Sequence, residues 1–533
     1  MNKLLVSVIM LSSFFHVDHL FAQYKDSLAM KYAATITPDE LKEHLYYLAS
    51  DAFKGRDTGS PELMRAGAYL AQQYQDQGIP PCVNGVSYFQ EYPLKQVRFG
   101  ESTIALNDAQ FTFKKDFYTF GGFEAIDLKG VDCVFAGYGI EDAKYNDYAK
   151  IDVNGKVVMM LAGEPMDKAG NSIFTGNTAL SEWSDDFRKK RDLAKSKGAK
   201  AIMIIDPGFD FIIGRIGYFL DQPNMALDYP NAHAEDEMVL PYFFISPAMA
   251  DSFLKANKKK SSSEISKKIA AKRKPITFAF KKKVSMKMAI EKKSFTSQNV
   301  LCFIEGSDPE LRAEVVVISA HFDHVGEMNG KIYNGADDDG SGTVSAIEIA
   351  EAFIQAKKEG HGPMRSVLIL HVSGEEKGLL GSEWYSEFPV FPLENTVCDL
   401  NIDMIGRVDD AHKDNDRYVY VIGSDKLSTQ LHAISESANS TYTNLALDYT
   451  YNSPDDPNRF YYRSDHYNFA KHKIPVIFYF SGVHEDYHQP GDDPEKILYD
   501  KMSVIAKLVF HTAWEVANRK DRLVVDVESD FQD

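Results

Sequence analysis

The chain has 533 residues, a formal net charge of −18 at pH 7, and a composition of 44% hydrophobic and 26% charged residues. This is the composition of a globular protein, and the length exceeds what one hydrophobic core usually supports, so we expect two or three domains. The negative charge argues against nucleic acid as a partner, because a polyanion would be repelled over most of the surface.

The first 22 residues have the pattern of a signal peptide. Lys3 provides a positive charge, Leu4 to Phe15 form an apolar stretch, and Ala22 is a small residue before the expected cleavage point. A buried N-terminal helix or strand is the less favoured alternative. Because no later apolar run is long enough to cross a bilayer, we expect no membrane span and a secreted or periplasmic protein.

Two helices are predicted next. Thr37-Pro38 is a typical helix start, and Leu41, Leu45 and Leu48 follow at helical spacing. A second helix is expected from about Glu62 to Gln77. The polar segment between them contains two glycines and is expected to be a loop.

From about Tyr92 to Lys283 the sequence predicts a separate β-rich module. Short β-like runs occur at 131–136, 156–161, 201–205 and 242–245, with a helix at 187–197. The region has few histidines and no tight pairing of histidine with carboxylate, so we do not expect the reaction centre here. Its basic stretch, Lys258 to Lys283, is better explained as a solvated helix face or loop than as a docking patch for an acidic partner.

From about Val284 onward, strand-like runs alternate with helical ones. The predicted strands are 299–304, 314–320, 366–372, 397–402 and 476–480, and the clearest helices are 342–357 and 501–517. This alternation predicts an α/β fold with a mixed, largely parallel sheet and helices on both faces.

Metal-type side chains follow four of these strands. They are His321 with Asp323, Glu375 with Glu376, Asp403, and His488. Each alone has an ordinary explanation, such as a surface ion pair or an acidic helix start. In open α/β sheets, however, ligands bind beyond the carboxyl ends of the strands. The coincidence of four such ends therefore favours a metal centre.

Between the first two strands lies a glycine-flanked run of three aspartates, Asp337 to Asp339. Buried together without a cation, these carboxylates would repel one another. A calcium loop would need further acidic positions that are not evident. A loop that delivers one aspartate to a metal pair fits better. Ligands drawn from His and carboxylates suit zinc with an open coordination position, and manganese or cobalt in the same geometry. The four cysteines, Cys82, Cys133, Cys302 and Cys398, are scattered and predict no thiolate site.

In this order, the motifs resemble those of the co-catalytic di-zinc aminopeptidases, the leucyl and bacterial aminopeptidase-like family of clan MH. The likeness rests on His321-Phe322-Asp323, the run Gly335 to Gly342, Glu375-Glu376, Asn401-Ile402-Asp403-Met404 and His488, and extends to Ser464-Asp465-His466 and Gly55-Arg56. It implies the zinc-peptidase fold, with a catalytic domain made of residues 23–91 and 284–520 and a tail of 521–533. Residues 92–283 are similar at Phe135 to Val158 to a protease-associated domain and would be an insertion of that kind.

The resemblance also implies residue roles. The ligands of two zinc ions would be His321, Asp338, Glu376, Asp403 and His488, with Asp338 shared between the ions. Glu375 would be the general base that takes a proton from water, and Asp323 would orient His321. Asp492 would orient His488 in the same way, and Asp465 and Arg407 would support the site or contact substrate.

The implied activity is hydrolysis of N-terminal residues from peptides. A glutaminyl cyclase shares the fold but uses a single zinc, and the presence of both Asp338 and Asp403 favours peptide hydrolysis. A carboxypeptidase or dipeptidase of the same family stays open, with Arg407 or Arg463 available for a carboxylate. A non-enzymatic, receptor-like protein is the least favoured, because such relatives lack the ligands. The side-chain preference and the oligomeric state are not predicted.

Overall fold

The computed structural model describes residues 25–106, 109–167, 169–217, 220, 223–229 and 239–528. The expected signal peptide, residues 1–22, and the end of the expected tail, residues 529–533, lie outside the described residues. Among the described helices, none combines the length and the apolar character needed to cross a bilayer.

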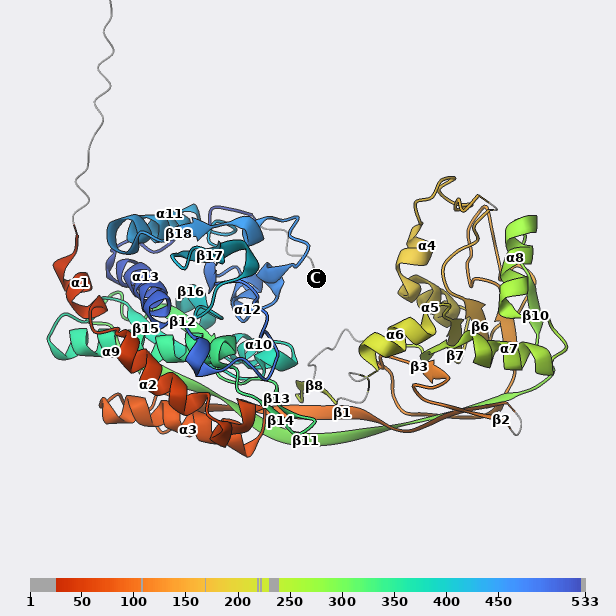
Figure 1. Ribbon diagram of the computed structural model, residues 1–533, viewed down its shortest axis with the longest axis horizontal. Helices are drawn as coiled ribbons and strands as arrows, with labels where there is room; N and C mark the ends of the chain where they lie inside the picture. The colour runs from red at the N-terminus through yellow and green to blue at the C-terminus, as the bar shows by residue number, and fades with distance from the viewer. Residues whose placement is uncertain are drawn as a thin grey trace, which may run out of the picture. The chain divides into compact units, whose positions relative to one another are not determined.

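The chain divides into two compact units. The first unit consists of the chain up to Glu91 together with Ser297–Asp533, and the second unit is Tyr92–Thr296. Both boundaries fall inside long strands, β1 (Phe89–Leu106) and β11 (Val284–Ile304). The colours of Figure 1 show the first unit built from the two ends of the chain and the second unit from its middle.

The first unit is organised around a mixed sheet with the strand order β18-β17-β19-β16-β12-β15-β11. The strands are β12 (Val315–His321), β15 (Ser366–Val372), β16 (Thr396–Ile402), β17 (Tyr418–Ile422), β18 (Ala446–Asp448) and β19 (Val476–Phe480), and a small hairpin joins β13 (Gly326–Met328) to β14 (Lys331–Tyr333). Strands β15, β12, β16 and β19 are mutually parallel, whereas β11 and β17 run antiparallel to their neighbours β15 and β19. The predicted α/β fold with a mixed sheet is confirmed.

Helices cover both faces of this sheet. They are α1 (Ser27–Ala33), α2 (Pro38–Leu48), α3 (Pro61–Asp76), α9 (Gly342–Lys358), α10 (Leu380–Glu387), α11 (Thr429–Ala438), α12 (His466–Lys471) and α13 (Tyr499–Asn518). Alternate side chains of β12 point to opposite faces. Val316 and Ile318 share a core with α2, α9 and α13, whereas Val315 and Val317 share another with α10 and α12.

Local sequence explains how the N-terminal helices begin. The Thr37 side chain accepts a hydrogen bond from the Glu40 amide, and Ser60 caps α3 in the same way, each just before a proline. In the loop between these helices Gly55 has a φ of +70°, and a Cβ there would lie 2.1 Å from the Tyr333 carbonyl oxygen. Only glycine fits this close approach of two backbones.

The second unit has its own sheet and core. Its six-stranded sheet has the order β10-β5-β6-β7-β9-β3, with β5, β6, β7 and β9 parallel. These strands are β3 (Phe117–Tyr118), β5 (Cys133–Ala136), β6 (Val157–Leu161), β7 (Ala201–Ile205), β9 (Tyr242–Ile245) and β10 (Thr277–Ala279). Strands β2 (Ala109–Thr112), β4 (Ile126–Val131) and β8 (Asn224–Leu227) pair with the parts of β1 and β11 that belong to this unit.

The second unit also contains helices, more than the predicted β-rich module had. They are α4 (Glu182–Asp185), α5 (Phe187–Ser196), α6 (Phe209–Ile216), α7 (Pro247–Ala256) and α8 (Ser262–Lys272). The basic stretch forms α8 and the segments beside it. Ile265 and Ile269 of α8 are buried, while Lys267 and Lys268 are exposed. The lysines therefore lie on a solvated helix face, as the favoured interpretation held.

Candidate metal centre

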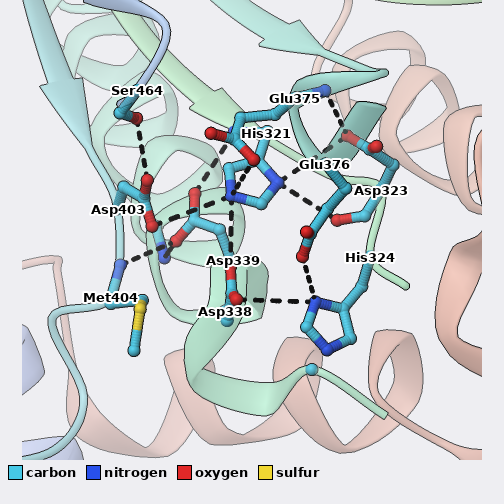
Figure 2. A network of polar contacts seen from close by, with 12 residues as sticks. His321, Asp323, His324, Asp338, Asp339, Glu375, Glu376, Asp403, Met404 and Ser464 are labelled. Atoms are coloured by element: carbon cyan, nitrogen blue, oxygen red, sulfur yellow. Dashed lines mark hydrogen bonds and ion pairs between the residues drawn. The ribbon is translucent and has the colours of Figure 1, made fainter. Parts of the chain in front are cut away.

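The proposed metal ligands meet at one edge of the first unit's sheet. His321 ends β12, Glu375 and Glu376 follow β15 after two residues, and Asp403 directly follows β16. These strands are parallel neighbours, so their carboxyl ends lie side by side. Figure 2 shows His321 surrounded by Asp338, Glu375 and Asp403.

Asp338 lies between two histidines, with one carboxylate oxygen facing each. Its Oδ1 is 3.3 Å from His321 Nε2, and its Oδ2 is 3.1 Å from His488 Nε2. Asp403 Oδ1 is 3.7 Å from His321 Nε2, and Glu376 Oε2 is 3.1 Å from His488 Nε2. Neighbouring ligand atoms around a tetrahedral zinc ion, each about 2.1 Å from the metal, are about 3.4 Å apart. These distances are compatible with the predicted arrangement of two groups around Asp338. The triads whose ligand atoms all lie within 4.8 Å of one another are His321-Glu375-Asp403 and His324-Asp338-Glu376.

The hydrogen bonding of these atoms also fits metal ions. His321 Nε2, Asp338 Oδ2 and Glu376 Oε1 are buried, and none of them makes a hydrogen bond of good geometry, although His324 Nδ1 lies 2.8 Å from Glu376 Oε1. Buried polar atoms are normally satisfied. A divalent cation in each group would satisfy them and offset the repulsion between the carboxylates.

The other two aspartates of the run, Asp337 and Asp339, contact other groups. Asp337 accepts a hydrogen bond from the Gly406 amide at 2.6 Å, and its other oxygen lies 3.2 Å from His484 Nε2. Asp339 binds backbone: its carboxylate accepts from the amides of His321 (3.2 Å), Gly342 (2.8 Å) and Met404 (3.2 Å). Of the three, Asp338 is the one that faces both histidines.

Asp492 fixes the backbone of the aspartate run. Its carboxylate accepts hydrogen bonds from the amides of Asp337, at 3.0 and 3.1 Å, and of Asp338, at 3.1 Å. The sequence suggested that Asp492 would orient His488. In the structure its contacts are with the loop that carries Asp338, because the chain folds back after His488 and brings the carboxylate beneath that loop.

Glu375 lies beside the His321 group. Its Oε2 is 3.9 Å from His321 Nε2, and its amide donates to Asp323 Oδ1 at 3.3 Å. Burial raises the pKa of Glu375 well above the usual glutamate value, against the lowering effect of His321. Glu376 and Asp403 raise it further. A carboxyl group with a raised pKa holds a proton more readily, which suits acid–base work.

Asp323 is held rigidly next to His321. Thr58 donates to Asp323 Oδ2 at 2.7 Å, and the Glu375 amide contacts its other oxygen. His321 Nδ1 lies 3.1 Å from the Asp323 carbonyl oxygen and 3.7 Å from its carboxylate. The second ring nitrogen of His321 is therefore oriented by the Asp323 backbone at least as much as by its side chain.

His324 and Ser464 contact the predicted ligands, and neither was assigned a role from the sequence. His324 is fully buried, its Nδ1 is 2.8 Å from Glu376 Oε1, and the two side chains lie side by side in Figure 2. Ser464 donates to Asp403 Oδ2 at 2.7 Å. Ser464 belongs to a motif of the resemblance, and His324 directly follows His321-Phe322-Asp323, so their places in and beside these motifs are the signal that could have identified them.

Asp465 and Arg407 differ in their relation to the centre. Asp465 is buried and accepts a hydrogen bond from Ser382 at 2.5 Å, and burial raises the pKa of Asp465 to about 7. Arg407 is engaged by two other carboxylates, Asp486 at 3.1 Å and Glu485 at 3.2 Å. These contacts occupy the guanidinium that a substrate carboxylate would need.

A pocket is lined by three of the predicted metal ligands, Asp338, Asp403 and His488. The other residues that line it are Glu375, Met404, Phe460, Arg463, Phe478, Phe480, Val483 and Tyr487. Five of these eight are large apolar side chains. Arg463 is held at one side, where it stacks over the Phe460 ring and donates to the Tyr487 hydroxyl at 3.3 Å. The pocket is therefore suited to an apolar group with a polar end directed at the metal ligands.

Comparisons with known proteins agree with this geometry. Residues 299–513 match peptidase family M28. Two probable leucine aminopeptidases, from Arthroderma otae and Trichophyton verrucosum, are 31% and 30% identical to the chain over 216 residues, which are 39% of this chain and 56% of each relative. The chain thus matches little more than half the length of these relatives.

One solved structure extends the likeness to nearly the whole chain. It is an aminopeptidase from Aneurinibacillus sp. strain AM-1, 19% identical, with a TM-score of 0.54 over 94% of this chain and 99% of that one. At this identity the likeness shows a shared fold. The resemblance stated from the motifs is confirmed by the family match. Over residues 299–513 the chain is similar to peptidase family M28.

Proposed function

We propose that this protein is a zinc-dependent aminopeptidase that removes N-terminal residues from peptides. The observation that carries the proposal is Asp338, whose two carboxylate oxygens face His321 and His488 at 3.3 and 3.1 Å. This arrangement supports a pair of ions that share one carboxylate. In the proposal His321 and Asp403 complete one ligand group, and Glu376 and His488 complete the other.

Two zinc ions, when bound, supply positive charge for a developing oxyanion and make a water molecule acidic enough to be deprotonated near neutral pH. Glu375 accepts the proton of this water and passes it to the nitrogen of the leaving amine. Its carboxylate is near the His321 group without being needed as a ligand. Asp323 keeps the His321 ring in place, so that Nε2 faces the ion.

The proposed substrate end is the N-terminus. Carboxylates dominate the floor of the pocket, and a free ammonium group is attracted by them. The apolar wall formed by Phe460, Phe478 and Phe480 favours an apolar side chain on the first residue. Arg463 is the cation through which a carboxypeptidase or dipeptidase would recognise its substrate, and the substrate panel below distinguishes these activities.

The remaining parts of the proposal rest on sequence patterns. The second unit is proposed to be a protease-associated domain inserted into the peptidase, because Phe135 to Val158 resembles the opening of such domains. The N-terminal pattern supports export, to the periplasm or the medium.

The test uses the full chain loaded with zinc. Leucyl, phenylalanyl and methionyl chromogenic amides are compared with N-acetyl-leucyl amide and with a C-terminal substrate that has a blocked N-terminus. We expect hydrolysis of the free aminoacyl amides alone, loss of activity with a chelator and recovery with zinc. Hydrolysis of the blocked substrates at equal rates would refute the amine-end specificity, and ammonia release from an N-terminal glutamine peptide would favour a cyclase.

Two variants test the assigned roles. Glu375→Gln should retain its zinc and lose roughly 10²–10⁴-fold in kcat, whereas Asp338→Asn should lose zinc from both groups. Glu387→Gln is the control, because this glutamate is about half exposed and its one ion pair among the described residues is with His472, at 3.6 Å. Normal turnover in Glu375→Gln, or full zinc content in Asp338→Asn, would overturn the respective role.

A further inference from the structure

A second cluster of metal-type side chains lies between helices α2 and α9, apart from the metal centre. It consists of His44 from α2 and of Glu348 and Glu351 from α9. One ligand atom from each residue lies within 4.8 Å of the other two. The two glutamates are three residues apart, so they lie on the same face of α9, and this face is turned toward α2.

The burial of the Glu348 carboxylate is not explained by its ion pair with His44 alone. The residue is 1% exposed, and neither of its carboxylate oxygens has a hydrogen-bond partner. Its closest charged neighbour is His44, with Nε2 3.4 Å from Oε1. A buried carboxylate without hydrogen bonds is costly, and the few that exist are paired or bind a metal ion.

His44 is oriented as a metal ligand would be. Its Nδ1 lies 2.6 Å from the hydroxyl of Tyr69 on α3, which leaves Nε2 to face the glutamates. Metal-binding histidines are usually held by a hydrogen bond at the other ring nitrogen in this way. Gln77 donates a hydrogen bond to Glu351 and thereby steadies the third side chain.

The spacing fits a tetrahedral zinc ion. The 3.4 Å between His44 Nε2 and Glu348 Oε1 equals the distance of about 3.4 Å between adjacent ligand atoms when each is about 2.1 Å from the metal. The carboxylate oxygen of Glu351 lies within 4.8 Å of both of these atoms. A change in a side-chain torsion of Glu351 would bring this oxygen to the ligand–ligand distance of about 3.4 Å. His44 and Glu351 are partly exposed, which leaves room for a water molecule as the fourth ligand.

We propose that His44, Glu348 and Glu351 bind a zinc ion that is separate from the catalytic pair. The site has its own three ligands and lies two turns along α9 from the aspartate run. The ion ties α2 to the helix that begins at that run, and its role is structural. Neither the proposed peptidase activity nor the ligands of the metal centre enter into this inference.

The test measures zinc per chain on the full protein, dialysed against a zinc buffer of fixed free concentration. Glu348→Gln and His44→Gln should each bind one zinc ion fewer than the wild-type protein. Glu43→Gln, which changes an exposed glutamate next to His44, should bind as many as wild type. The predicted difference of one ion holds whether the metal centre binds two ions, one or none.

A second measurement, the rise in Tm on adding zinc, applies if a single variant folds poorly. It also excludes ions at the metal centre as the source of the zinc effect. In an Asp338→Asn background, added zinc should still raise the Tm, and the further change Glu348→Gln should remove this rise. Anomalous diffraction at the zinc edge should show a peak beside His44. Equal zinc content in wild-type protein and both single variants, or no anomalous peak in zinc-loaded crystals, would overturn the proposal.

Discussion

Arg56 should be among the most sensitive positions in the N-terminal part of the first unit. The residue lies in the loop between α2 and α3 and is 1% exposed. Its guanidinium donates to four backbone carbonyl oxygens: Phe322 at 2.8 Å, Leu48 at 2.9 Å, Asn334 at 2.8 Å and Gly335 at 2.9 Å. These carbonyls belong to the end of α2, the end of β12 and the start of the aspartate run.

The change Arg56→Met keeps most of the side-chain length and removes every donor. A hydrogen bond to a charged group contributes about 1.5–3 kcal/mol, and four carbonyls would lose such a partner. The sum overstates the effect, because burial of the guanidinium is itself costly, as the lowered pKa of Arg56 indicates. Removing one partner from a buried charged network typically costs about 3–5 kcal/mol, and we expect a loss of this size.

Urea unfolding in the presence of a chelator measures the effect without a contribution from bound metal. The matched control is Arg65→Met in α3, whose side chain is 55% exposed and, besides a 3.8 Å ion pair with Glu62, donates one exposed hydrogen bond to the Ala52 carbonyl oxygen. This control should lose less than about 1 kcal/mol. An Arg56→Met protein within about 1 kcal/mol of wild type would refute the reasoning, since four buried carbonyls would then have lost their donor at almost no cost.

Three further predictions concern single side chains. Ser464→Ala removes the hydroxyl that binds Asp403, and zinc affinity should fall about 10–100-fold in a competition titration; an unchanged affinity would contradict the positioning role. His324→Gln should weaken the group that contains Glu376 by a similar factor of about 10–100, and equal retention of all ions would count against it. Burial lowers the pKa of Lys501 from 10.5 to about 7. The folded protein therefore binds fewer protons than the unfolded chain between these values, so stability rises with pH there. Relative to Lys501→Met, wild type should gain about 3–4 kcal/mol between pH 7 and pH 10, and a difference that does not change with pH would exclude the shift.

The sequence predicted the strands of the parallel sheet well, because strands buried on both faces are continuous apolar runs. Ser366–Val372 and Val476–Phe480 have the predicted bounds. Strand β1 was not predicted, and β11 was predicted only over 299–304. β11 begins at Val284, and its middle carries exposed charged residues such as Lys292, so the apolar pattern is interrupted there.

The sequence could predict those site residues that directly follow the parallel strands of the sheet. His321, Glu376 and Asp403 follow neighbouring parallel strands, and this order alone places them together. The contact of His324 with Glu376 depends on how the chain turns after β12, which no local pattern specifies. His44 and Glu348 are separated by some three hundred positions, and each lies in a helix whose sequence is ordinary, so only the packing of α2 on α9 reveals their contact.

The run Asp337 to Asp339 carries a constraint that its composition conceals. Three identical residues in a row suggest that one could replace another, yet each has different neighbours. Asp337 contacts one imidazole and one amide, Asp338 contacts three imidazoles, and Asp339 accepts from three amides. An insertion or deletion of one aspartate in this loop would shift the carboxylates relative to these three environments. The length of this segment is therefore more tightly constrained than its charge. A chain with two or four aspartates here should lose its metal ions, whereas Asp337→Asn should retain them.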